Sequence, residues 1–218
     1  MIDHHRKFIF LHIPKCGGTS IEKVILSHYN INNDWTKEYP LEELPMKVRA
    51  EFSIGFNHQH FLLNEILNEY PKCLNYFKFA FIRNPFSRIV SEYNYILSYS
   101  KNLENLSFRD FILNLENYLN IFAYVYHDLS LCDYLLNKEG ELVVDFVGRL
   151  ENFQEDFNEV CSNLEMPNLL LPHTNVSKKS RHNASKKNYT EYYDNETREI
   201  VARKFAKDIE YFGYEFGE

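Results

Sequence analysis

The chain has 218 residues, a formal net charge of −7, 16% aromatic residues and 25% charged residues. This composition excludes a disordered chain, a collagen-like chain and a coiled coil. A chain of this length predicts one domain, over residues 1–218, which buries roughly 70% of the surface of its unfolded form and needs no disulfide or metal to fold.

No stretch of the sequence approaches the ~18 consecutive apolar residues of a membrane span, and the first apolar run is too short for a signal peptide. The four cysteines lie far apart without a Cys-x-x-Cys pair, so they indicate neither a zinc site nor a disulfide framework. They are Cys16, Cys73, Cys132 and Cys161. We therefore expect a cytoplasmic protein without a transmembrane segment.

The first predicted element is a strand over Phe8–Ile13, a short run rich in β-forming residues. The turn-forming segment Pro14–Gly18 ends this strand. Thr19 or Ser20 can then cap a helix that contains Ile21–Leu26. The order of strand, glycine-containing loop and helix is typical of an α/β domain.

A second unit of this kind begins with an apolar strand over Phe77–Ile82. Asn84 is the expected cap of the helix that follows, and Pro85 is its expected first residue. A third strand, over Leu142–Gly148, precedes a helical pattern that runs through Cys161. Three alternations of strand and helix predict an α/β fold with a P-loop-like parallel β-sheet flanked by helices.

The remaining segments predict short helices and one loop. Residues 102–137 have the mixed apolar and polar spacing of helices. The segment Leu169–Tyr189 loses this pattern, contains Lys and Arg but no acidic residue, and predicts a basic loop. Asp194–Thr197 is the start signal of a C-terminal amphipathic helix that continues to Phe212.

The loop Pro14–Ser20 predicts a phosphate-binding site, because backbone N–H groups at a helix start and the helix dipole attract anions. It is not a Walker A loop, because Lys15 precedes Gly17 and Gly18. A cysteine phosphatase loop would have an Arg at position 22, where this chain has a Glu. A plain glycine turn is the alternative. The thiol of Cys16, beside a lysine and near a helix start, is expected to be reactive but not catalytic.

The segment Ile13–Ser20 resembles the 5′-phosphosulfate loop of carbohydrate sulfotransferases, particularly the heparan and uronyl 2-O-sulfotransferases and their soluble bacterial relatives. The resemblance extends over most of the chain and implies a single sulfotransferase-like domain. It also implies that the donor is 3′-phosphoadenosine 5′-phosphosulfate (PAPS) and that the product is adenosine 3′,5′-bisphosphate. The loop residues that would bind this donor are Lys15, Cys16, Gly17, Gly18, Thr19 and Ser20.

The segment Arg83–Ser91 resembles the 3′-phosphate motif of the same family. In that motif the Arg that leaves the strand and the Ser eight residues later bind the 3′-phosphate of the donor. The resemblance therefore implies this role for Arg83 and Ser91. On a helix that begins after Asn84, Ser91 lies two turns along, where it can face the same phosphate.

The segment Asn57–His60 is similar to the His-x-His motif of the 2-O-sulfotransferases. This similarity implies that His60 is the catalytic base, that His58 assists it, and that Lys15 stabilises charge on the leaving phosphate. Histidine pairs at this spacing arise easily by chance, so the motif gains meaning only beside the other two. A metal site is the alternative, but the sequence offers no obvious third ligand.

The basic loop matches a family segment that folds over the nucleotide. The resemblance implies donor contacts by Lys178, Lys179, Ser180 and Arg181. A solvated loop is the alternative for this segment.

Together, the motifs predict metal-independent transfer of a sulfuryl group from PAPS to a hydroxyl group of a carbohydrate or glycolipid acceptor. The net charge of −7 argues against a nucleic acid or a heparin-like polyanion as the partner. Two alternatives stay open. A magnesium-dependent P-loop kinase would prefer ATP, and a non-catalytic nucleotide-binding protein would have no use for a base at His60.

Overall fold

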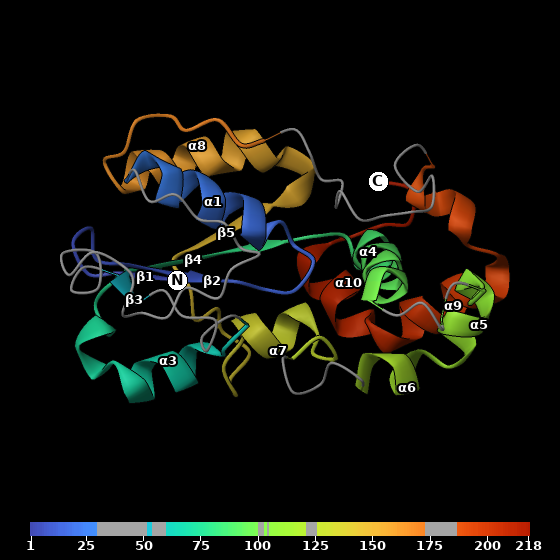
Figure 1. Cartoon of the computed structure of the whole chain (residues 1–218). Helices are drawn as coiled ribbons and strands as arrows, with labels where there is room; N and C mark the ends of the chain where they lie inside the picture. The colour runs from blue at the N-terminus through green and yellow to red at the C-terminus, as the bar shows by residue number, and fades with distance from the viewer. Residues whose placement is uncertain (30–51, 54–59, 100–102, 104, 121–125, 173–186) are drawn as a thin grey trace. The chain divides into compact units, whose positions relative to one another are not determined.

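The computed structural model describes residues 1–29, 52–53, 60–99, 103, 105–120, 126–172 and 187–218 (Figure 1). The chain forms two compact units, each built from two segments. Unit 1 comprises Met1–Ile82 and Tyr134–Pro172, and unit 2 comprises Arg83–Asp133 and His173–Glu218. The expectation of a single domain over the whole chain stays a prediction.

Unit 1 contains a five-stranded sheet in the order β3-β1-β2-β4-β5. Its strands are β1 (Ile2–Asp3), β2 (Phe8–Leu11), β3 (Phe52–Ser53), β4 (Phe77–Ile82) and β5 (Phe146–Arg149). The predicted parallel sheet is confirmed for β2, β4 and β5, which pair in parallel through Leu11 with Ala80 and Ile82 with Arg149. Strands β1 and β3 extend it in antiparallel fashion. They have two residues each, too few for a sequence pattern to reveal.

Helices cover the sheet of unit 1 on both faces. They are α1 (Gly18–His28), α3 (Leu63–Glu69) and α8 (Phe153–Asn163), with the short 3-10 helices η3 (Pro71–Cys73) and η6 (Leu150–Asn152). Helices α1 and α8 lie on one face and α3 lies on the other (Figure 1). All four residues of β2 are buried, as expected for a parallel strand with helices on both faces.

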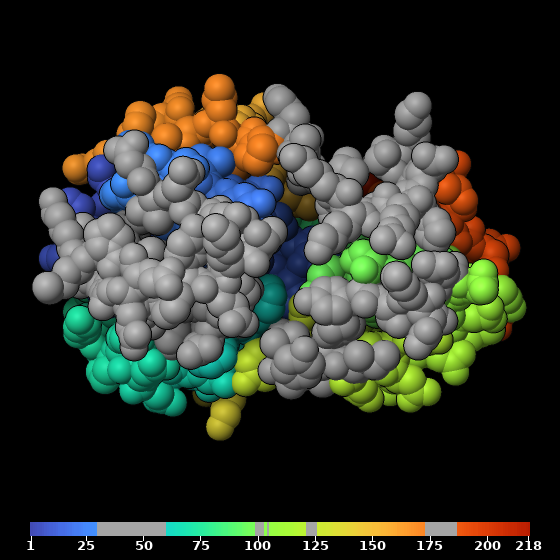
Figure 2. Space-filling model, viewed as in Figure 1, coloured from blue at the N-terminus to red at the C-terminus, as the bar shows by residue number. Residues whose placement is uncertain are grey.

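The core of unit 1 lies between the sheet and the helices α1 and α8. Phenylalanines of β2 and β4, including Phe10 and Phe79, pack there against Ile21 and Ile25 of α1 and Phe157 of α8. The chain that follows α8 also covers this core. The space-filling view shows this part of the chain, in orange, directly against α1, in blue (Figure 2).

Unit 2 is helical. Its elements are α4 (Pro85–Tyr99), α5 (Phe108–Leu113), α6 (Leu115–Asn120), η8 (Tyr189–Tyr192), α9 (Asn195–Lys204) and α10 (Ala206–Phe212). Helix α7 (Leu131–Leu135) begins in unit 2 and ends in unit 1. Aromatic side chains fill the core of unit 2, where Phe86, Phe108 and Tyr193 stack edge-to-face. The hydroxyl of Tyr193 donates to the carbonyl of Phe86 at 2.8 Å, and burial raises the pKa of this phenol.

The helix starts show where the sequence signals succeeded. Helix α4 begins at Pro85, and the side chain of Asn84 accepts the amide of Phe86 at 3.0 Å, as predicted. Asp194 caps α9 through the amide of Thr197, also as predicted.

Several predicted boundaries are wrong. The strand predicted over Phe8–Ile13 ends at Leu11, because the amide of Ile13 already turns back to the carbonyl of Leu11 at 3.2 Å. Gly17, not Thr19 or Ser20, is the cap residue of α1, because the preceding turn already uses a left-handed backbone at this glycine. The strand predicted over Leu142–Gly148 begins only at Phe146. The C-terminal helix is divided at Phe205, whose buried ring belongs to the core of unit 2.

Candidate functional site

The predicted phosphate loop connects β2 to α1 in unit 1. Lys15 and Gly17 both have left-handed backbone conformations, with φ of 65° and 85°. A Cβ atom at Gly17 would lie 2.7 Å from the ring of Phe153 and 2.8 Å from the side chain of Leu150. Glycine is therefore required at this position for its backbone angle and for the close approach of α8.

The first turn of α1 presents backbone donors at the end of this loop. The first N–H groups of a helix have no partner within the helix, and the helix dipole makes this end positive. Ser20 is further along, and its N–H donates to the carbonyl of Gly17 at 2.9 Å. Of the predicted backbone donors, Gly18 and Thr19 are therefore placed best to meet an anion. Lys15 is half-buried and Thr19 is exposed.

Cys16 differs from the reactive thiol that the sequence predicts. Its side chain is only 1% exposed, and its sulfur donates to the carbonyl of Pro14 at 3.5 Å. The turn points this side chain into the protein, so a soluble reagent has poor access to it. Cys16 can still contribute its backbone to the loop.

A buried histidine and glutamate lie behind the loop. His12 follows β2 directly, and its Nδ1 donates to Oε1 of Glu22 on α1 at 3.0 Å. The two residues are 6% and 3% exposed. A Cβ atom at Gly18 would lie 2.1 Å from the ring of His12, so this glycine leaves the space that the imidazole occupies.

The predicted base His60 contacts the same histidine. Its Nδ1 donates to the backbone carbonyl of His12 at 2.7 Å, and the two rings meet edge-to-face with centroids 4.6 Å apart. A carbonyl only accepts, so the proton of a neutral His60 ring is on Nδ1 and Nε2 is the unprotonated nitrogen. This is the protonation state that a general base requires. His58, its predicted assistant, lies outside the described residues.

The predicted 3′-phosphate motif lies in unit 2, at the start of α4. The Nε of Arg83 donates to the hydroxyl of Ser87 at 2.8 Å. Ser87 and Ser91 are four residues apart on α4, so their side chains share one face of the helix. Arg83 and Ser91 are half-buried, and Ser87 is 9% exposed. The structure thus adds a hydroxyl between the two predicted residues.

Three residues of these arrangements were not predicted from the sequence. Glu22 lies on the buried face of α1 beside Ile21 and Ile25, and a carboxylate on an apolar helix stripe was the available signal. Ser87 was visible as a hydroxyl four residues from both predicted ligands. His12 gave no signal of its own, because it lies outside the motif segment Ile13–Ser20.

The remaining predicted ligands, Lys178, Lys179, Ser180 and Arg181, lie outside the described residues. Within the described part of the chain, no group of three or more His, Cys, Asp or Glu side chains is arranged to hold a metal ion. The same part contains no helix long and apolar enough to cross a membrane.

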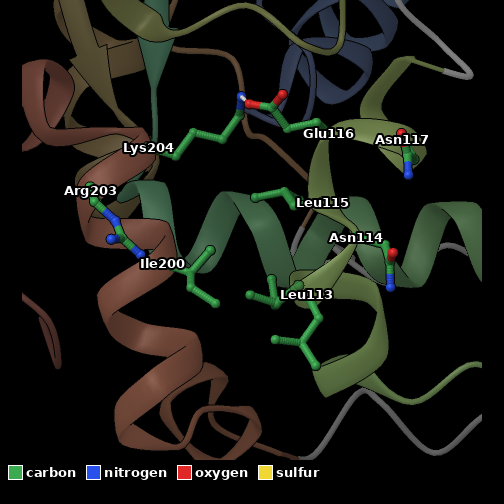
Figure 3. A pocket seen from close by; sticks show the side chains of 9 residues that line it. Leu113, Asn114, Leu115, Glu116, Asn117, Ile200, Arg203 and Lys204 are labelled. Carbon is green, nitrogen blue, oxygen red and sulfur yellow. Dashed lines mark hydrogen bonds and ion pairs between the residues drawn. The ribbon is translucent and has the colours of Figure 1, made fainter.

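Unit 2 also carries a shallow cavity of about 530 Å³ between α5, α6 and α9. Figure 3 shows the ammonium of Lys204 pointing to the carboxylate of Glu116, and their ion pair of 3.1 Å neutralises one of the cations on its wall. None of the residues predicted for the functional site lines this cavity.

The parallel sheet, the glycine-containing loop at the start of α1 and the histidine that donates to the carbonyl of His12 define an α/β protein with a candidate group-transfer site. The sequence pattern of the Sulfotransferase family matches residues 1–215, and the chain belongs to this family. A stretch of 94 residues, 42% of the chain, is 33% identical to an uncharacterized protein of Archaeoglobus fulgidus and covers 70% of that protein.

The fold is similar to that of a solved sulfotransferase. The crystal structure of the sulfotransferase from Alicyclobacillus acidocaldarius matches with a TM-score of 0.52 and 16% sequence identity. The match covers 94% of this chain and 92% of that chain. It confirms the predicted fold class, and the family and the fold together support sulfotransfer activity.

Proposed function

We propose that this protein transfers a sulfuryl group from PAPS to a hydroxyl group of a carbohydrate or glycolipid acceptor, as in the 2-O-sulfotransferases that its motifs resemble. The observation that carries the proposal is the hydrogen bond from His60 to the carbonyl of His12, in the same unit as the phosphate loop. This bond places the proton of a neutral imidazole on Nδ1 and holds the ring beside His12, two residues before the loop Pro14–Ser20.

The proposed reaction is a single in-line displacement. The acceptor oxygen attacks the sulfur of PAPS while Nε2 of His60 takes the hydroxyl proton. The bond from sulfur to the phosphate oxygen breaks, and its electrons stay on the phosphate of adenosine 3′,5′-bisphosphate. Lys15 and the amides of Gly18 and Thr19 would stabilise this growing charge, with roughly 3 to 4 kcal/mol from each well-placed donor.

The second motif would bind the distant end of the donor. The carboxyl ends of β2 and β4 lie at the same edge of the sheet of unit 1, because these strands are parallel neighbours. Arg83 follows Ile82, the last residue of β4, directly in the chain. Its planar guanidinium suits two hydrogen bonds to one phosphate, and we propose this role for it together with Ser87 and Ser91.

The acceptor is proposed from charge. The chain has a net charge of −7, which repels strongly anionic polymers, so a small or weakly charged glycan or glycolipid fits better. In this proposal His58 orients the acceptor or the base, and Lys178, Lys179, Ser180 and Arg181 cover the bound nucleotide.

Ligand-dependent thermal stabilisation tests the donor. A ligand present at 100 times its dissociation constant stabilises the folded state by about 2.7 kcal/mol. We expect adenosine 3′,5′-bisphosphate to raise the melting temperature without magnesium, and ATP with magnesium to raise it less. The opposite order would favour a kinase.

Transfer of labelled sulfate from PAPS to a panel of glycans tests the reaction. His60→Ala should lower turnover by roughly 10² to 10⁴ and leave the affinity for adenosine 3′,5′-bisphosphate nearly unchanged, because the base acts only on the acceptor. Lys15→Ala should reduce both. His5→Ala, at an exposed histidine of the same unit, is the matched control. Donor binding without transfer to any acceptor would favour the non-catalytic alternative.

A further inference from the structure

The side chains of His12 and Glu22 have no role in the proposed reaction, yet they are among the few buried polar groups in the described part of unit 1. Burying two ionisable groups costs several kcal/mol of solvation, and an apolar pair of the same volume is often equally stable or more stable. The pair is therefore poorly explained by stability alone. Its contacts indicate what else it does.

His12 contacts both parts of the candidate site in unit 1. Its ring lies where a side chain on Gly18 would otherwise be, directly behind the first turn of α1. Its backbone carbonyl accepts the proton of His60 Nδ1, and its ring touches the ring of His60. Glu22 holds the imidazole in this place from α1, and Phe10 stacks on it at 5.8 Å.

We propose that His12, held by Glu22, is a positioning residue. It fixes the tautomer and orientation of His60, and it fixes the position of the Gly18 backbone that would contact the donor. The catalytic part of this inference rests on the proposed function, whereas the contacts are testable without any activity. Nδ1 of His12 must carry its own proton, because the carboxylate of Glu22 only accepts.

A second role for Glu22 has to be separated from this one. The amine of Met1 is buried and donates to the carbonyl of Phe10 at 2.9 Å. Burial lowers the pKa of this amine, and the charge of Glu22 partly opposes that effect. If Glu22 only balanced the charge of this amine, its loss would change stability without changing His60.

Long-range ¹H–¹⁵N correlation spectra of the histidine rings at neutral pH separate these roles, because they distinguish the two imidazole tautomers. The His60 signals are assigned by their loss in His60→Ala. We expect the wild-type His60 ring to carry its proton on Nδ1. A wild-type His60 protonated on Nε2, or a mixture of both tautomers, would overturn the inference without any variant.

Two substitutions test the role of Glu22. Glu22→Gln keeps an oxygen that accepts from His12, so it should retain the His60 tautomer and turnover within about threefold of wild type. Glu22→Leu removes the acceptor and frees the His12 ring and backbone to shift. It should give mixed His60 tautomers and lower turnover at saturating donor about tenfold or more, because small displacements of a catalytic group are costly.

Glu92→Leu is the matched control for the spectra, because Glu92 is a buried glutamate paired with a histidine in unit 2. It should leave the His60 signals unchanged. If Glu22→Leu keeps the His60 signals and the turnover of the wild type, the positioning role is wrong. If the spectra are as expected but the protein transfers no sulfate, the proposed function is wrong and the positioning of His60 by His12 is still supported. If Glu22→Leu does not fold, the wild-type spectrum decides.

Discussion

The two segments that follow β2 and β4 are both turns into a helix, but they offer different chemistry. After β2, two glycines bring the backbone of α1 close to His12 and Phe153, so the available donors are mainly amides. After β4, an asparagine cap and a proline start α4 in the ordinary way, and the donors are side chains. The comparison shows two ways in which the start of a helix can present hydrogen-bond donors.

Each of these helices also carries a buried glutamate that pairs with a histidine. Glu22 of α1 pairs with His12, and both oxygens of Glu92 on α4 accept from Nδ1 of His127, at 2.9 and 3.0 Å. His12 lies against Gly18 of the predicted phosphate loop and contacts His60, whereas the ring of His127 stacks on Tyr95 at 5.5 Å. The proposed role of the first pair therefore depends on its neighbours and not on the pair itself.

The largest expected effect is on stability, in the pair of unit 2. His127→Ala leaves the carboxylate of Glu92 buried without its histidine and should lower the free energy of unfolding by about 3 to 5 kcal/mol. Urea unfolding measures this loss. His5→Ala, at an exposed position, should change it by less than about 0.5 kcal/mol. Equal values for the two variants would show that the pair in unit 2 contributes nothing.

The next largest effect is expected where the backbone of Gly18, at the start of α1, approaches the ring of His12. Alanine favours a helix over glycine by about 1 kcal/mol, but a Cβ at Gly18 would collide with the ring of His12. Gly18→Ala should therefore lower the free energy of unfolding by about 1 to 3 kcal/mol and weaken the binding of adenosine 3′,5′-bisphosphate. In a His12→Ala background the collision is absent, so the same substitution should cost much less. Additive losses in this double-mutant cycle would place the two residues out of contact.

A smaller effect is expected where the donors are side chains. Arg83→Lys removes the planar fork and its bond to Ser87, so adenosine 3′,5′-bisphosphate should bind about 10 to 50 times more weakly. Adenosine 5′-phosphate, which lacks the 3′-phosphate, should be affected little. Titration calorimetry with both nucleotides makes the comparison. Equal weakening of both would assign Arg83 a role other than reading the 3′-phosphate.

The smallest expected effect is that the cysteines of the native protein do not react with a thiol reagent. All four cysteines are buried, and none of them forms a disulfide. Burial, together with the carboxylate of Asp208, raises the pKa of Cys132 to about 12, which leaves almost no thiolate at pH 8. Iodoacetamide should label none of the four in the native protein within the time that labels all four in urea. Rapid labelling of Cys16 that bound nucleotide prevents would restore the exposed, reactive thiol first expected from its place in the loop.

Local signals in the sequence determined the parallel strands β2 and β4, the start of α4 at Pro85 and the position of a glycine-containing loop between a strand and a helix. These features depend on neighbouring residues, because apolar runs, capping residues and glycine turns act over a few positions. The burial of complete strands in a parallel sheet makes their sequences unusually clear.

Only the tertiary structure decided how these segments meet. His12 pairs with Glu22 across a strand and a helix, and His60 reaches the carbonyl of His12 from 48 residues away. Phe153 and Leu150 leave no space for a side chain on Gly17, the cap of α1, and Cys16 became buried because the same turn points its side chain inward. Such outcomes depend on which distant residues fill the space around a position, and no pattern of neighbouring residues contains that information.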